Sequence, residues 1–79
     1  DPNAYWSPDL EDMEVRKAIN IRDGVRNELH LFHLPTGKDI LVAITDEPLW
    51  RFTPKWISDT ELQYQLPGGV TYTFSLPAQ

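Results

Sequence analysis

The last third of the chain alternates apolar and polar residues with a period of two, on both sides of a Pro-Gly-Gly triplet. This alternation predicts two β-strands that each bury one face. A three-residue loop at residues 67–69 would keep all the apolar side chains on one face, because a slip of one residue reverses every side chain. The predicted register pairs Leu66 with Val70, Tyr64 with Tyr72, and Leu62 with Phe74.

The preceding residues predict further strands. Residues 13–22 place Met13, Val15, Ile19 and Ile21 on one side, with Lys17 as a break, and an amphipathic helix stays open as the alternative. Turn signals at residues 23–24 and 35–38 separate this segment from predicted strands at residues 28–34, 39–45 and 49–53. We predict an all-β fold, a small twisted antiparallel meander of five or six strands, open or partly closed. An irregular N-terminal arm at residues 1–12 precedes a single β domain at residues 13–79.

The size of the chain limits how it is stabilised. Seventy-nine residues without cysteine must depend on packed apolar side chains or on a partner. The formal net charge of −5 argues against nucleic-acid binding, because phosphate backbones repel an acidic chain. No apolar run approaches the roughly 20 residues of a membrane helix. The chain starts at Asp1, which favours export to the periplasm or the cell exterior, or a start inside a longer protein.

Two stretches of the sequence are alike, "YWSPDLEDMEV" at residues 5–15 and "KWISDTELQYQL" at residues 55–66. Each places a Trp before a turn that contains Asp, and a strand follows. This arrangement resembles the repeat of TolB-like β-propellers, whose blades begin with a Trp-Ser-Pro-Asp-Gly turn. The similarity extends from Trp6 to Tyr64. It departs where Leu10 and Thr60 replace the glycine, where Ile57-Ser58 replaces Ser-Pro, and in the 50-residue interval between the tryptophans.

The resemblance implies a blade-like sheet and says little about function. A propeller needs about four to eight blades to close, which 79 residues do not supply. We therefore expect an isolated blade-like sheet with added strands. A piece of a larger assembly and a chance similarity of β-turns stay open as alternatives.

Few residues point to catalysis or to a metal. His30 and His33 would lie on opposite faces of one strand, so they could not share a metal ion. The acids at residues 9, 11 and 12 lack the spacing of a calcium loop, and Ser7 and Ser58 are expected to cap turns. We expect neither an enzyme nor a bound cofactor or metal.

Rings are concentrated between residues 49 and 74, and a small uncovered sheet cannot hide all of them. Exposed Trp and Arg side chains are typical of binding hot spots. The candidate binding residues are Trp50, Arg51, Lys55 and Trp56. We expect a non-catalytic protein-binding module that docks through a sheet edge or an aromatic patch, with self-association through an edge strand as a further possibility. The alternative is a small acidic inhibitor or immunity-type protein that blocks an enzyme.

Overall fold

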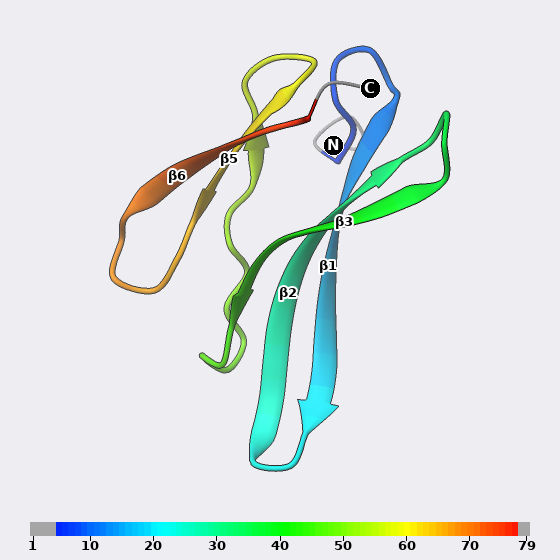
Figure 1. Cartoon of the computed structure of the whole chain (residues 1–79). Helices are drawn as coiled ribbons and strands as arrows, with labels where there is room; N and C mark the ends of the chain where they lie inside the picture. The colour runs from blue at the N-terminus through cyan, green and yellow to red at the C-terminus, as the bar shows by residue number, and fades with distance from the viewer. Residues whose placement is uncertain (1–4, 78–79) are drawn as a thin grey trace.

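The computed structural model describes residues 5–77, and these residues form two small antiparallel sheets without any helix (Figure 1). The first sheet has the order β1-β2-β3 and the second has the order β4-β5-β6, and they are not closed into a barrel. The all-β prediction is confirmed, and the helical alternative for residues 13–22 is wrong. The strands are β1 (Asp12–Ile21), β2 (Gly24–His33), β3 (Lys38–Thr45), β4 (Lys55–Trp56), β5 (Glu61–Gln65) and β6 (Thr71–Ser75).

The predicted register of the last hairpin is confirmed. Leu62 pairs with Phe74 and Tyr64 pairs with Tyr72. The Leu66 N–H donates to the Val70 carbonyl at 3.3 Å, which closes the loop of residues 67–69. Both glycines of this loop have positive φ, a conformation that disfavours residues with a Cβ. The two tyrosine rings stack with their centroids 5.7 Å apart.

The predicted strand at residues 49–53 is wrong, because residues 46–54 form an irregular loop. Leu49, Phe52 and Thr53 have φ values of 60°, 63° and 44°, which are incompatible with an extended strand. The expected side-chain alternation is therefore lost, and Phe52 enters the core while Trp50 stays half-buried. The Phe52 carbonyl accepts a hydrogen bond of 2.7 Å from the Gln65 N–H, which ties the loop to the second sheet.

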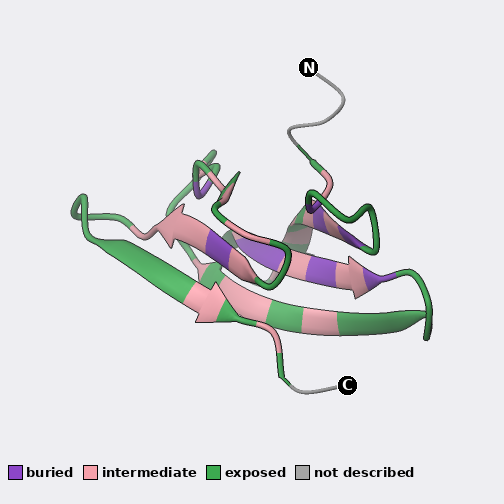
Figure 2. Ribbon diagram, turned by 90° about the horizontal axis from the view of Figure 1, so that it is seen from above, coloured by how far each residue is buried: buried purple, intermediate pink, exposed green. Residues whose placement is uncertain are grey.

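The apolar core lies between the two sheets and is small. Its fully buried apolar members are Leu29 and Leu31 from β2, Phe52 from the loop, and Leu62 from β5. Figure 2 shows the buried segments as short stretches, while the hairpin tips are exposed. Because β2 is the central strand of the first sheet, it carries half of these residues. Phe52 joins the two sheets, since it comes from the segment that connects them.

The predicted boundary between arm and domain falls near the start of β1. Residues 1–4 and 78–79 of these two predicted units lie outside the described residues. In the described part of the arm, Trp6 forms a β-bridge with Met13, and the Glu14 N–H donates to the Tyr5 carbonyl at 2.9 Å. The arm thus lies along the first strand of the domain. Among residues 5–77 there is no helix long and apolar enough to cross a membrane.

Candidate binding surfaces

The structure does not gather the four candidate binding residues into one patch. Trp50 and Arg51 line a cavity against the first sheet. Trp56 lines a separate groove beside the turn of residues 6–10, and Lys55 lies at a third place beside β5. The two charged residues are exposed, and the two tryptophans are half-buried.

Both tryptophans hold separate parts of the chain together. The indole Nε1 of Trp50 donates to the Gln65 carbonyl at 2.8 Å, which links the loop to β5. The indole Nε1 of Trp56 donates to the Tyr5 carbonyl at 3.2 Å, which links β4 to the N-terminal arm. A buried or half-buried indole usually finds such a partner for its N–H. These hydrogen bonds occupy the indole N–H of each tryptophan, which is the polar group of the ring.

The two Trp-containing turns are built on the same plan. Trp6 bridges to Met13, and Trp56 pairs with Leu62. In the first turn, the Ser7 hydroxyl donates to Asp9 Oδ1 at 2.6 Å and accepts from the Asp12 N–H at 3.1 Å. The Ser7 hydroxyl holds the pKa of Asp9 below its usual range, with a further contribution from the Glu11 N–H.

The serine of the second turn has a similar role. The Ser58 hydroxyl accepts from the Thr60 N–H at 3.3 Å and donates to Glu61 Oε1 at 3.2 Å. Both serines therefore cap turns, as the sequence predicts. Leu10, which stands where the propeller repeat has glycine, adopts a φ of 62°, whereas Thr60 does not have a positive φ. The first turn retains the backbone conformation that glycine favours, although its residue is leucine.

The two histidines lie on opposite faces of β2, as predicted. His33 lies on the face that contains Leu31, and its Nδ1 is 2.7 Å from Asp12 Oδ1 in a pair that is almost fully buried. His30 lies on the other face, where both ring nitrogens are 2.7 Å from carboxylate oxygens of Glu28 and Asp39. Within residues 5–77, no three His, Cys, Asp or Glu side chains are arranged so that they could hold a metal ion.

A chain of charged side chains crosses the outer face of the first sheet, the face that contains His30. Lys17 Nζ is 2.9 Å from Asp39 Oδ2, and Arg26 Nε is 2.9 Å from Glu28 Oε2, with His30 between the two carboxylates. The hydrogen bond from Lys17 lowers the pKa of Asp39, with a further contribution from His30. The hydrogen bond with His30 lowers the pKa of Glu28, and the charge of Arg26 adds to this effect. These contacts favour the ionised carboxylates.

A buried carboxylate lies on the opposite face. Glu14 is 4% exposed, and burial raises its pKa although the charge of Arg16 opposes the shift. The nearest contact is between Arg16 Nε and Glu14 Oε2 at 3.5 Å, and that oxygen has no hydrogen-bond partner within residues 5–77. Arg16 therefore neutralises Glu14 only in part.

The strand edges differ in how well they are protected against pairing with another chain. The β3 edge carries Lys38 and Asp39 and a bulge at Val42, where the register with β2 shifts. The β4 edge is two residues long and follows Pro54. Charges, bulges, prolines and short length all discourage edge pairing. The β6 edge, with the sequence TYTFS, has none of these protections.

Comparisons with known proteins do not assign the chain to a family. No family model and no curated protein matches the sequence, and no solved structure matches the fold. The resemblance to the propeller repeat therefore stays a prediction.

Sequence reasoning missed two features that the structure reveals. Arg16 lines the same cavity as Arg51, because the loop of residues 46–54 folds back over β1 and β2. The alternation in residues 13–22 placed Arg16 and Glu14 on the polar side of β1, which could have marked them as a pair. The unprotected edge of β6 was visible as an uncharged strand, but which edge stays unpaired depends on the sheet order.

Proposed function

We propose that this chain is a non-catalytic protein-binding module that adds an extended segment of a partner protein to the free edge of β6. The single observation that carries the proposal is the outer edge of this strand, which is uncharged, has no bulge and pairs with no other strand among residues 5–77. The sheet edge is favoured over an aromatic patch, because the four candidate residues lie in three different places. Strand addition gains affinity from main-chain hydrogen bonds at such an edge.

The hydrogen-bonding pattern identifies which residues of β6 face the free edge. The Leu66 N–H donates to Val70, and the Leu76 N–H donates to the Thr60 carbonyl at 2.8 Å. Even-numbered residues of β6 therefore direct their backbone groups toward β5, since these positions alternate along an antiparallel pair. The backbone groups of Thr71, Thr73 and Ser75 point away from β5, and all three residues are exposed. They offer a partner a regular set of donors and acceptors.

A comparison of the strand order in the two sheets also supports the proposal. The first sheet contains the Trp6 bridge followed by β1, β2 and β3, and the second contains β4, β5 and β6. By this correspondence, β6 is equivalent to β2, and the second sheet has no described strand equivalent to β3. We propose that the two sheets are consecutive blade-like units and that the partner segment takes the position of β3 beside β6.

The proposed partner segment has the chemistry of β3 itself. The sequence of β3, KDILVAIT, is rich in β-branched and apolar residues and supplies apolar side chains to the core through Ile40 and Val42. Beside β6, such a segment would cover Tyr72, which is 42% exposed. A peptide with the sequence of residues 38–45 is therefore a suitable probe.

The test measures binding of this peptide to the intact chain by calorimetry. Thr73→Pro removes one outward N–H and leaves the hydrogen bonds to β5 in place, so we expect binding to weaken by about tenfold or more. Thr73→Val keeps the N–H and serves as the matched control, with affinity close to that of the original chain.

Two results would overturn the proposal. One is the absence of peptide binding to the original chain, and the other is equal binding by the Thr73→Pro variant while its circular dichroism spectrum is unchanged. Sedimentation of the chain without peptide measures its oligomeric state and so tests self-association. If Thr73→Pro dissociates an oligomer, the β6 edge binds a second copy, and strand addition is still the mode of binding.

A further inference from the structure

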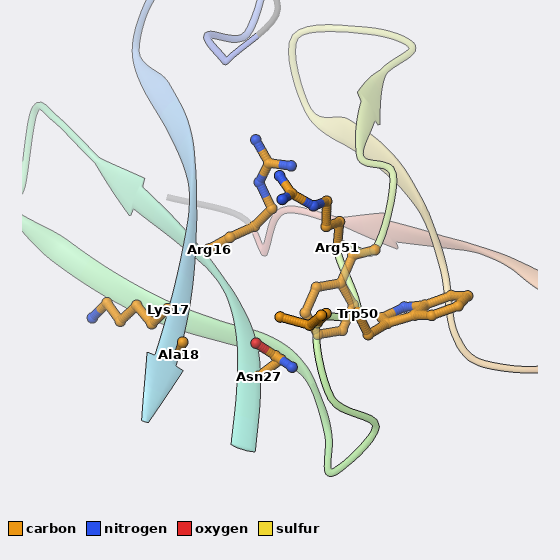
Figure 3. Close-up of a pocket in the computed structure, with 8 residues that line it drawn as sticks. Arg16, Lys17, Ala18, Asn27, Trp50 and Arg51 are labelled. Atoms are coloured by element: carbon orange, nitrogen blue, oxygen red, sulfur yellow. The ribbon is translucent and has the colours of Figure 1, made fainter. Parts of the chain in front are cut away.

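A cavity of about 200 Å³ lies between the inner face of the first sheet and the loop of residues 46–54 (Figure 3). Residues of β1 and β2 form the strand side of the cavity, and loop residues 49–52 form the other side. The strand residues are Arg16, Lys17, Ala18 and Asn27. Asn27 fixes the loop in this position, because its Nδ2 donates to the Glu47 carbonyl at 2.9 Å. The cavity is smaller than the roughly 300–1,000 Å³ that drug-sized ligands occupy, so it suits a small group.

Two arginines line this cavity, and only Arg16 has an acidic partner among the described residues, Glu14 at 3.5 Å. In Figure 3 the Arg51 side chain extends from the loop toward the guanidinium group of Arg16, while Lys17 points away from both. Lys17 belongs to the opposite face, where it binds Asp39. The Arg51 side chain makes no ion pair or hydrogen bond with any residue from 5 to 77. Two neighbouring cations repel each other, and an anion between them would remove this repulsion.

The charges around the cavity indicate the charge of the ligand. Three cations line the cavity, Arg16, Lys17 and Arg51. Two acids offset them, Glu14 at 3.5 Å from Arg16 and Asp39 at 2.9 Å from Lys17. The local excess is one positive charge, which matches one carboxylate better than a doubly charged phosphate. The net charge of −5 of the whole chain also disfavours polyanions.

The other residues that line the cavity indicate which kind of group is attached to the carboxylate of the ligand. Trp50 and Phe52 give the cavity an apolar side, and Leu49 is 87% exposed at its rim. An exposed leucine beside an indole forms an apolar surface that a small hydrophobic group can cover. Arginines beside an apolar wall have the chemistry to bind an acid that carries an apolar side chain.

We propose that this cavity binds a carboxylate attached to a small apolar group, with Arg51 and Arg16 holding the carboxylate and with Leu49 and Trp50 covering the apolar group. Two sources share this chemistry, the C-terminus of a peptide that ends in an apolar residue and a short free carboxylic acid. The site is independent of strand addition, because β6 contributes no residue to it.

The test titrates N-acetyl-leucine and its uncharged amide into the intact chain and follows the indole N–H resonance of Trp50 by NMR. We expect the acid to shift this resonance. The amide is expected to bind at least about tenfold more weakly than the acid, since hydrogen bonds to charged groups contribute more than neutral ones. Arg51→Gln is expected to weaken acid binding by a similar factor. Arg22→Gln, in the exposed β1–β2 turn, is the matched control and leaves the affinity unchanged.

Further titrations separate the alternatives. Tighter binding of a tripeptide that ends in leucine than of hexanoate assigns the site to peptide C-termini, and the reverse order assigns it to free acids. Equal binding of acid and amide, unchanged binding by a folded Arg51→Gln variant, or tighter binding of inorganic phosphate would each overturn the proposal. The peptide of residues 38–45 is also titrated into the Arg51→Gln variant. Equal binding of this peptide by the variant and the original chain shows that the test of the cavity is separate from the test of strand addition at β6.

Discussion

At the scale of a single residue, Leu10 has a backbone conformation that glycine adopts more readily than leucine. Its φ of 62° costs a residue with a Cβ about 1–2 kcal/mol, and glycine avoids this cost. The side chain is 58% exposed, so its removal loses little apolar burial. We expect Leu10→Gly to raise the free energy of unfolding by about 0.5–1 kcal/mol, measured by urea denaturation.

Leu34 provides the matched control, since it is 56% exposed and does not have a positive φ. Leu34→Gly is expected to lower the free energy of unfolding, because glycine gains more freedom in the unfolded chain. A loss of stability in both variants would show that the Leu10 side chain contributes more than its conformation costs.

At the scale of the element, the carboxylates on the outer face of the first sheet make its stability depend on pH. The pKa values of Asp39 and Glu28 are lowered in the folded chain, so both groups stabilise the fold at neutral pH. This stabilisation is lost as the pH falls through about 4 to the lower folded-state pKa values. We expect the urea midpoint to fall between pH 6 and pH 3, and Asp39→Asn to reduce this fall.

The effect of Asp39 is expected to be small, because its side chain is 47% exposed and solvent screens the ion pair. Asp23→Asn, in the β1–β2 turn, is the control that leaves the pH dependence unchanged. Glu14 acts in the opposite direction, because burial raises its pKa and thereby destabilises the folded state as the pH rises above about 4. An identical pH profile for Asp39→Asn and the original chain would contradict a role for the Lys17 contact.

The elements also show how far the sequence determines the fold. Strict alternation predicted the β5–β6 register, because one face is apolar and a slip would expose it. The same reasoning failed at residues 49–53, where the apolar residues alternate but the backbone does not extend. The hydrogen bond from Gln65 to Phe52 and the burial of the Phe52 ring decide this segment. Those contacts are tertiary, so local sequence does not reveal them.

At the scale of the whole molecule, Phe52 joins the two sheets. The ring is 1% exposed and contacts the core formed by Leu29, Leu31 and Leu62. We expect Phe52→Ala to lower the free energy of unfolding by about 3–5 kcal/mol, a large share of the stability of so small a domain, measured as a shift of the urea midpoint.

Leu49→Ala is the control for this change, because Leu49 has nearly the same φ of 60° and is 87% exposed in the same loop. It is expected to change the stability by less than about 0.5 kcal/mol. Similar losses for the two variants would show that the loop conformation, rather than the buried ring, holds the sheets together.

The candidate sites were predictable only where they follow from the strand pattern. Trp50 and Arg51 were identified as residues with binding chemistry, but their neighbour Arg16 lies 35 residues earlier in the chain. The loop brings the two arginines to one cavity. Its path depends on three residues with positive φ and on hydrogen bonds to β2 and β5, none of which a periodicity encodes. The charge network around His30 likewise depends on which residues of β3 lie beside β2.

The bare rim of the second sheet also has a consequence for the protein in concentrated solution. A neutral five-residue strand with two aromatic rings and no proline can template the growth of fibrils, since each added copy would present the same rim again. Acidic side chains elsewhere on the chain give copies mutual repulsion at neutral pH. Salt, or acidity near the isoelectric point of about 4.7, would weaken that repulsion and favour insoluble assemblies.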